Sequence, residues 1–337
     1  MKTKSFSHYI QRYFSYIHFQ RGYAKNTISS YADAILSFLL FLRKQTGKNP
    51  ESLCFDDISR EQILAFCDWL ESEKKVSIRT RNHRLAVLHA FFQFLQYETP
   101  VYLELCQSIL SIPMKKTPKT IPQYLSTEEM KMLFTLPDTK TKRGRRDLAL
   151  LVLLYDSAAR VQEIIDLRFE LITLGNQPKV RLTGKGNKTR IVPLMKNASM
   201  ILANYIKEQK LQIGDSLFFN SRKECLTRAG VSFIIDKYAN MAKEIFPNFN
   251  KNIHVTPHIF RHSKATHLIE CNMNLYYIRD FLGHSSVVTT EIYAKTTPEL
   301  MRLKIRERAP TFMIQQKKYF SKSEEDDLVN FVKGLYA

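Results

Sequence analysis

Hydrophobic positions recur at helical spacing through the first part of the chain, and this pattern predicts a bundle of helices. One stripe contains Ile28, Tyr31 and Ile35, and Asn26 and Thr27 stand where they can cap the helix that carries it. The expected helices cover residues 5–19, 28–43, 59–73 and 77–97, followed by a short helix after Pro100.

The helical pattern stops at residues 112–122, which hold three prolines and three lysines. Proline lacks an amide hydrogen and clashes with the preceding turn of a helix, so this stretch is extended. We therefore expect a first helical domain over residues 1–111 and a basic interdomain linker over residues 112–123.

A second domain, residues 124–305, mixes helical stripes with two short alternating segments. Residues 179–183 and 189–193 are typical of strands, and residues 184–188 form the hairpin turn between them. The predicted fold class is mainly α, of the α+β type, with a small antiparallel β-sheet in the second domain. Its expected helices cover residues 126–136, 142–157, 161–168, 195–209, 228–245, 257–271, 274–282 and 286–294.

A tail follows over residues 306–337, and its last part again has apolar residues at helical spacing, namely Leu328, Phe331, Val332 and Leu335. We expect a helix there that packs on a partner subunit or regulates the enzyme within one chain.

The charge changes this picture from a generic helical protein to one with a polyanionic partner. Lysine and arginine number 51 against 32 acidic residues, a net charge of +19. Residues 1–120 carry a net +7 and residues 121–337 a net +12, so both domains can face one polyanion. The five cysteines are scattered, which favours a reducing cytoplasm over a disulfide or zinc framework. We find no signal-peptide core, no membrane-spanning run and no glycine-rich phosphate loop.

Four short segments carry residue types suited to phosphate chemistry, although each also has an ordinary structural interpretation. Arg160 begins a helix with Glu163 one turn later, which on its own indicates a surface ion pair. Lys185, Lys188 and Arg190 flank the hairpin turn, where lysines are commonly only solvated.

The third and fourth segments contain histidines and a tyrosine. His258 and Arg261 share a helical face and can clamp two phosphate oxygens, whereas we assign His262 a structural packing role. A metal site is not expected, because the glutamate of zinc-protease helices is missing. His284 falls in a turn, and Tyr293 falls on the following helix, where a lone tyrosine is usually a packing residue.

Taken together, these residues could cleave a phosphodiester through a protein hydroxyl. A phenol with its usual pKa near ~10 needs positive charge or a base nearby to become a nucleophile. The ordered set resembles the catalytic set of the tyrosine recombinases, the integrase family of site-specific DNA recombinases. It comprises Arg160, Lys185, His258, Arg261, His284 and Tyr293, in segments such as Gly-Lys-Gly-Asn-Lys-Thr-Arg, His-Ile-Phe-Arg-His-Ser and Leu-Gly-His-Ser-Ser.

The resemblance, which extends over about residues 5–300, implies specific roles. Tyr293 would attack the scissile phosphate and leave a 3′-phosphotyrosyl link, while Arg160 and Arg261 hold the non-bridging oxygens. His258 and His284 would assist, Lys185 would protonate the leaving 5′-oxygen, and Glu163 would brace the site. The family works without ATP, metal or another cofactor. It acts on double-stranded DNA as a tetramer, with a helical core-binding domain and a catalytic domain gripping the duplex.

DNA contacts are also expected outside the catalytic set. The first domain offers a helix start and a basic stretch, Lys25, Asn26, Thr27, Arg79, Thr80, Arg81 and Arg84, and the hairpin offers Lys188 and Arg190. A solvated basic face is the alternative interpretation of these positions. For Arg81, we distinguish base readout from a phosphate contact by the salt dependence of binding in an alanine variant.

The resemblance leaves the biological role open. The pattern around residues 261–293 is most like recombinases of bacterial insertion sequences and transposons, and a Xer-like resolvase of chromosome or plasmid dimers is the alternative. A type IB topoisomerase and a non-catalytic DNA-binding accessory protein are further alternatives, the latter disfavoured by the complete catalytic set.

Overall fold

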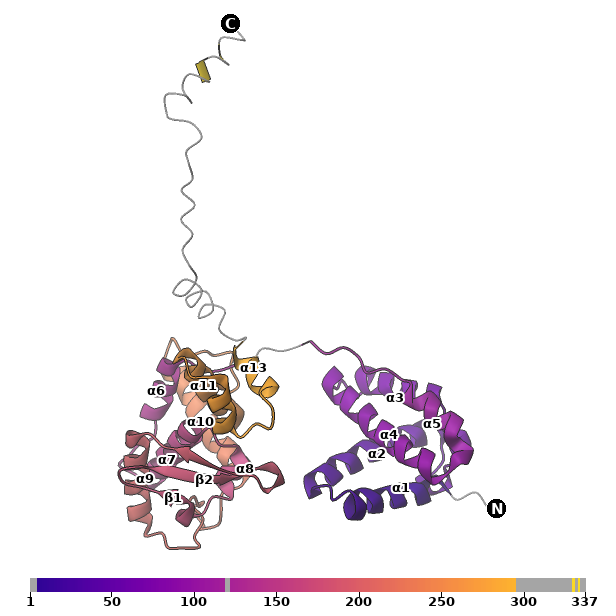
Figure 1. Ribbon diagram of the computed structural model, residues 1–337, viewed down its shortest axis with the longest axis horizontal. Helices are drawn as coiled ribbons and strands as arrows, with labels where there is room; N and C mark the ends of the chain where they lie inside the picture. Colours follow the sequence, from indigo (N-terminus) through magenta and orange to yellow (C-terminus); the bar gives the residue numbers. More distant parts are fainter. Residues whose placement is uncertain (1–4, 119–121, 295–328, 331–332, 334–337) are drawn as a thin grey trace. The chain divides into compact units, whose positions relative to one another are not determined.

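The computed structural model describes residues 5–118, 122–294, 329–330 and 333. Contacts divide the chain into two compact units, Met1–Lys119 and Thr120–Ala337, and the division falls within the stretch expected to be a linker. In the described part, no helix is both long and apolar enough to cross a membrane. Each unit is a separate packed body in Figure 1.

The first unit is all helical, as the hydrophobic spacing predicted. Short 3₁₀ turns at Pro50–Ser52, Phe55–Asp57 and Pro100–Tyr102 connect its longer elements. These longer elements are α1 (Phe6–Ser15), the π-helical turn η1 (Tyr16–Gln20), α2 (Lys25–Thr46), α3 (Arg60–Ser72), α4 (Ile78–Glu98) and α5 (Leu103–Leu110).

Helix α2 begins earlier than predicted. Its N-cap is Ala24, and Asn26 and Thr27 lie inside the first turn rather than before it. Alanine offers no capping oxygen, so the sequence carries no signal for this start. By contrast, Ser59 and Ser77 cap α3 and α4 through their side chains, as expected of serines in these positions.

Aromatic rings dominate the core of the first unit. Phe6 meets Phe55 and Phe91 edge-on, each at a ring-centroid distance of 5.5 Å. Phe66 packs edge-on against Phe38 at 5.2 Å, joining α3 to α2. Edge-to-face pairs add to the free energy of burial, which suits a small helical body with a single core.

Arg81 lies inside this unit, which corrects the expectation that it enters a DNA groove. Its residue is 3% exposed, and its Nε lies 3.5 Å from a carboxylate oxygen of Glu71. The same carboxylate binds the ammonium of Lys115 at 2.7 Å, and Asn82 forms two hydrogen bonds with the Lys115 backbone. Arg81 therefore belongs to a network that holds the start of the linker against α3 and α4.

The second unit combines helices with one small antiparallel sheet in the order β1-β2-β3. β2 (Lys179–Thr183) and β3 (Thr189–Pro193) form the predicted hairpin, and Val180 lies opposite Val192. β1 (Ile172–Thr173) has only two residues, too few to show alternation, and was not predicted. The helices are α6 (Thr127–Thr135), α7 (Lys142–Ser157), α8 (Val161–Ile165), α9 (Lys196–Gln209), α10 (Arg228–Ile245), α11 (Pro257–Glu270), α12 (Leu275–Leu282) and α13 (Val288–Ala294).

Two hydrophobic clusters stabilise the second unit. The larger one fills the space between the sheet and helices α6, α7, α9, α10 and the start of α11. The smaller one mounts α12 and α13 on α11 and contains Ala158, Ala265, Ile269, Ile278, Leu282 and Tyr293. Tyr293 is thus held by packing as well as by polar contacts. The expected tail at residues 306–337 lies almost wholly outside the described residues.

Candidate active site

A buried carboxylate, Glu163, organises the first part of the site. Its side chain is 3% exposed and accepts hydrogen bonds from the backbone amide of Arg160 at 2.8 Å and from the Arg160 guanidinium at 3.0 Å. Two further nitrogens, both from Arg190 on β3, donate to it at 2.9 and 2.8 Å. The carboxylate therefore fixes Arg160 at the start of α8 and ties α8 to the sheet.

The electrostatic environment keeps Glu163 ionised. Burial alone would raise the pKa of this carboxyl, but the hydrogen bonds and charge of Arg190, together with those of Arg160, outweigh it and lower the pKa below its usual value. Glu163 is thus an ionised carboxylate bound to two arginines, Arg160 and Arg190. Arg190, which was expected to contact DNA, has its guanidinium bound to Glu163 and to the Phe281 carbonyl at 3.0 Å. Its guanidinium is thus bound within the protein, and the residue also lines the cavity described below.

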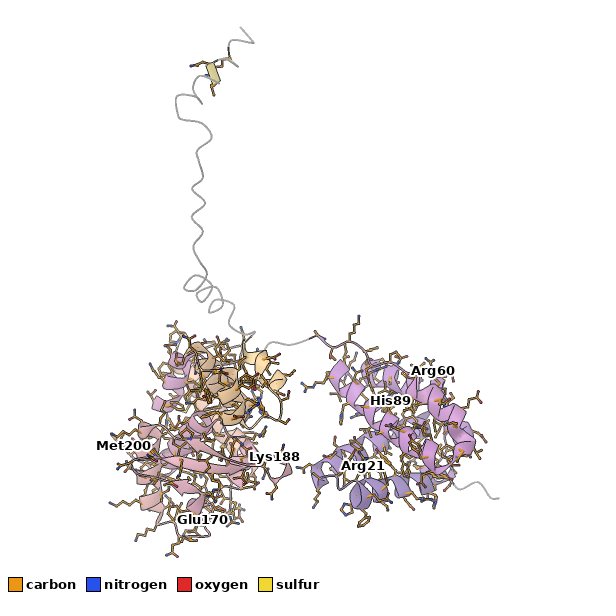
Figure 2. All side chains as sticks on the ribbon, in the orientation of Figure 1. Arg21, Arg60, His89, Glu170, Lys188 and Met200 are labelled. Atoms are coloured by element: carbon orange, nitrogen blue, oxygen red, sulfur yellow. The ribbon has the colours of Figure 1, made fainter. Side chains whose placement is uncertain are left out.

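Two glycines allow this close packing. A Cβ on Gly184, at the end of β2, would lie 2.8 Å from a Glu163 oxygen. Gly283 ends α12 with φ +65°, and a Cβ there would lie 2.9 Å from the Arg190 side chain. The hairpin turn that follows Gly184 contains the 3₁₀ turn Lys185–Asn187, so the backbone of Lys185 lies in this turn. Lys188 is on the same hairpin, as Figure 2 shows.

Arg261 is the most deeply placed cation of the site. It is 3% exposed, and its two terminal nitrogens donate to the carbonyls of Ala158 at 2.7 Å and Leu282 at 2.6 Å. These carbonyls lie at the ends of α7 and α12, which fixes the guanidinium between them. Burial, followed by the charges of Arg160 and Arg190, lowers its pKa to about 10, so it remains charged at neutral pH.

Tyr293 lies between histidine rings. Its hydroxyl is 2.8 Å from Nδ1 of His262 on α11, and the two ring centroids are 5.4 Å apart. The His284 ring is nearly parallel to the Tyr293 ring, at 6.4 Å and an interplanar angle of 12°. The His258 ring stacks on the His262 ring, with their centroids 6.2 Å apart. The contact of His262 with Tyr293 was missed, because the sequence analysis gave this histidine only a packing role.

The tyrosine hydroxyl experiences opposing influences. Burial raises the pKa of Tyr293, while the charges of Arg261 and Arg160 and a hydrogen bond from Arg261 lower it, with a net increase. The phenol is therefore protonated at neutral pH and needs help to lose its proton. His262 and His284 are both neutral there, because burial first and neighbouring positive groups second lower the pKa of each to about 4.

A cavity of about 640 Å³ opens beside these groups. It is lined by residues of the α8 start, the hairpin, and the turn between α12 and α13, namely Arg160, Gly184, Lys188, Thr189, Arg190, Asp280, Gly283, His284, Ser285 and Thr289. Its cations and hydroxyls suit an anionic ligand, and guanidinium groups bind phosphate oxygens with two donors at once. Among the described residues, no group of three or more His, Cys, Asp or Glu could hold a metal ion.

The other expected DNA contacts are in the first unit. Lys25, Asn26, Arg79 and Thr80 are exposed at the starts of α2 and α4. Arg84 is half-buried and donates to the Ser37 hydroxyl. Because the first four residues are exposed, they can contact a DNA phosphate backbone. Their role in DNA binding stays a prediction.

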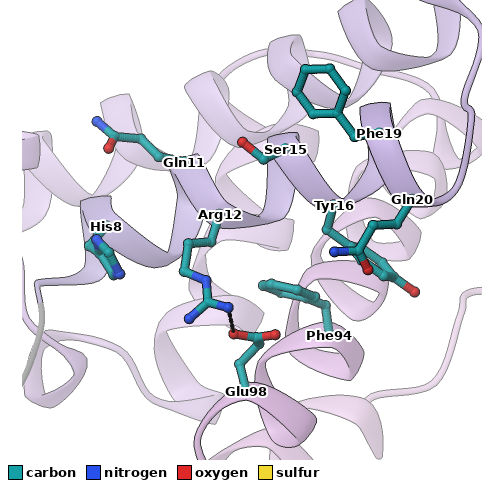
Figure 3. A pocket seen from close by; sticks show the side chains of 9 residues that line it. All are labelled: His8, Gln11, Arg12, Ser15, Tyr16, Phe19, Gln20, Phe94 and Glu98. Atoms are coloured by element: carbon teal, nitrogen blue, oxygen red, sulfur yellow. Dashed lines mark ion pairs between the residues drawn. The ribbon is translucent and has the colours of Figure 1, made fainter.

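A second hollow, of about 440 Å³, is in the first unit between α1, η1 and the end of α4. Figure 3 shows the ion pair that crosses it, Arg12 with Glu98 at 2.6 Å, and the aromatic rings of Tyr16 and Phe94 beside it. Phe19 lines the rim and is 79% exposed. The Arg12–Glu98 ion pair is partly exposed to solvent, and such ion pairs contribute little to stability. The hollow therefore lies at the surface of the first unit and is not a packing defect in its core.

Comparison with known proteins identifies the family. Residues 123–299 match the "Phage integrase family", and residues 10–99 match the "Phage integrase, N-terminal SAM-like domain". The chain is 32% identical over 320 residues to the "Putative integrase/recombinase y4rC" of Sinorhizobium fredii, covering 94% of each protein. It is 30% identical to the tyrosine recombinase XerC of Bacillus pumilus, covering 87% of this chain and 93% of the relative.

Solved structures share the fold. The XerH site-specific recombinase in a post-cleavage complex with palindromic difH substrate aligns with a TM-score of 0.66 at 21% identity, covering 85% of this chain and 80% of that one. The Tn1549 transposon integrase in complex with circular intermediate DNA aligns with a TM-score of 0.64 at 18% identity, covering 88% and 98%. With a family match over most of the second unit and relatives that span nearly the whole chain, this protein belongs to the phage integrase family of tyrosine recombinases, which cleave and rejoin DNA strands at specific sites.

Proposed function

We propose that Tyr293 is the nucleophile of this recombinase and that the groups around it divide the work of strand cleavage. The observation that supports this most directly is the placement of the Tyr293 hydroxyl against His262, with Arg261 bonded nearby and Arg160 on the adjoining cavity. Attack of the phenol oxygen on phosphorus leaves a 3′-phosphotyrosyl link and a free 5′-hydroxyl. The link conserves the phosphodiester for rejoining.

The two arginines stabilise the charge that builds up on the non-bridging oxygens. Arg160 faces the cavity from the start of α8, and Glu163 holds it in place. Arg261 is held between two carbonyls, so little reorganisation is needed when a phosphate arrives. Removing one such donor typically costs about 10²–10³ in rate. His258 and His284 add donors, and Lys185 at the hairpin tip protonates the leaving 5′-oxygen.

The two units divide DNA binding. The first unit grips the duplex as a core-binding domain through Lys25, Asn26, Thr27, Arg79, Thr80 and Arg84, and the second unit adds Lys188. The net charge of +19 supports a large electrostatic contribution to binding. Four copies assemble on two duplexes within the cytoplasm, and the tail over residues 306–337 links neighbouring copies.

The recombination serves a mobile element. The name integrase/recombinase of the relative y4rC, matched at 32% identity over 94% of its length, supports this proposal. The match to the tyrosine recombinase XerC at 30% identity supports the alternative equally. The alternative, resolution of chromosome or plasmid dimers, predicts a different set of cut sites.

Covalent capture on genomic DNA tests these proposals together. Protein would be incubated with fragmented host DNA, denatured, and the DNA still attached sequenced from its 3′ ends. Tyr293→Phe is the matched control, because it removes one oxygen and retains the ring. Attached ends at the borders of an element support mobilisation, whereas ends at a single chromosomal site support dimer resolution. Equal attachment in Tyr293→Phe would refute the nucleophile.

A further inference from the structure

We infer that His262 accepts the phenolic proton of Tyr293 during the attack on phosphorus and returns it on rejoining, an inference that rests on the nucleophilic role proposed for Tyr293. His262 follows Arg261 directly in the sequence but points its Nδ1 at the tyrosine hydroxyl, 2.8 Å away. That distance lies within the ~2.6–3.2 Å over which a general base takes a proton directly.

The chemical state of His262 fits this role. Its pKa is lowered to about 4 by burial, then by His258 and Arg261, so the ring is neutral at physiological pH. In the tautomer that carries its proton on Nε2, Nδ1 offers a lone pair to the Tyr293 hydroxyl. A bound phosphate brings negative charge to Arg261, which offsets one of the effects that lower the basicity of the imidazole.

The proton inventory of the step closes without a further reactant. As the bond from the Tyr293 oxygen to phosphorus forms and the bond from phosphorus to the 5′-oxygen breaks, the phenolic proton moves to Nδ1 of His262. The 5′-oxygen takes its proton from Lys185. In the rejoining step the 5′-hydroxyl attacks phosphorus and returns its proton to the Lys185 amine, while the phenolate leaves and recovers its own proton from His262. The imidazolium formed in between faces the negative charge of the intermediate.

The neighbouring histidines have other arrangements. His284 directs its Nδ1 to the Thr290 hydroxyl at 3.0 Å and lies parallel to the tyrosine ring. His258 stacks on His262 and is exposed to solvent.

A substrate with sulfur in place of the 5′-oxygen separates the two proton transfers. The thiolate leaves without a proton, so cleavage of this duplex depends on nucleophile activation alone. Lys185→Ala should be slow on the ordinary site and recover on the sulfur substrate. His262→Asn, which can hold a hydrogen bond but cannot take the proton, should be slower than wild type by about 100-fold on both, within the range for general bases.

His267 supplies the matched control. It lies on the same helix, and its Nδ1 is also 2.8 Å from a tyrosine hydroxyl, that of Tyr155, away from the cavity. His267→Asn should cleave at the wild-type rate. In His262→Gly, added imidazole should restore cleavage in proportion to its concentration. DNA binding by gel shift and far-UV circular dichroism check that each variant is folded.

Three results would overturn the inference. His262→Asn cleaving at the wild-type rate would leave His262 a packing residue. Faster cleavage by His262→Asn would show that the contact restrains the tyrosine rather than activating it. Recovery of His262→Asn on the sulfur substrate would move the histidine to the leaving-group side. A wild-type protein that binds the site but forms no Tyr293-linked DNA would refute the proposed nucleophile itself, which is a separate failure.

Discussion

Replacing Glu163 by glutamine should destabilise the second unit strongly while leaving the first unit unchanged. The substitution keeps the shape of the side chain but removes the charge that neutralises Arg190, whose side chain is 11% exposed. The –NH₂ group of the glutamine would also be a hydrogen-bond donor that faces the donor groups of Arg160 and Arg190. Breaking a buried ion pair by removing one partner costs about 3–5 kcal/mol.

Urea denaturation measures this loss in the free energy of unfolding. With a denaturant slope of about 2–3 kcal/mol per molar for a unit of this size, the midpoint of the second unit should fall by about 1–2.5 M. The only tryptophan of the chain, Trp69, lies in the core of the first unit, so its fluorescence reports on that unit alone. Circular dichroism follows both transitions. The tryptophan midpoint serves as an internal control and should stay at its wild-type value.

The pH dependence has a definite sign. The pKa of Glu163 is lower in the folded protein, so the unfolded chain binds the proton more readily. The stabilisation is therefore complete above the usual carboxyl pKa and is lost as the pH falls through the lower, folded value. Glu163→Gln should lose this part of the acid sensitivity. Adding Arg190→Gln should recover part of the stability, because it removes the unpaired charge. A midpoint shift below about 0.5 M, or an equal shift of tryptophan fluorescence, would refute the reasoning.

Two further substitutions test the packing around the site and the corrected position of one arginine. Gly283→Ala should lower the stability of the second unit by about 1–3 kcal/mol and should also slow cleavage, because φ is positive there and the new methyl group meets Arg190. Gly175→Ala is the control, since Gly175 also has a positive φ but has open space around it. A larger effect at Gly283 than at Gly175 measures the contact with Arg190. Arg81→Ala should lower the urea midpoint reported by Trp69 and leave the salt dependence of DNA binding unchanged, whereas a slope smaller by about one unit would identify a phosphate contact instead.

The sequence predicts most elements because their hydrophobic spacing is regular. The bounds of α7 and of both hairpin strands agree with the expected residues, and α6 begins one residue after the expected start at 126. Periodicity does not reveal an element of two residues, such as β1, or a helix whose N-cap is alanine, such as α2. Helix α8 ends at Ile165, before the predicted residue 168.

The site was foreseeable in its residue types but not in its contacts. Arg81 and Arg190 were both expected on the DNA surface because they are charged, yet each is drawn inside by a carboxylate, and sequence spacing does not show which arginine has such a partner. The contact of His262 with Tyr293 joins two helices across 31 residues of chain. Only the tertiary packing of α13 on α11 reveals it.

Tyr293, the proposed nucleophile, is on α13, 133 residues after Arg160, and this order has a consequence for protein synthesis. At about 5–20 residues per second, a ribosome needs about 7–27 s to pass from one to the other. During that interval the first unit is complete, while Arg190 still lacks its carbonyl partner at Phe281 and the hydroxyl is absent. Translation thus supplies the unit proposed to grip DNA before the residue proposed to cut it, and a message truncated between them encodes a chain without Tyr293.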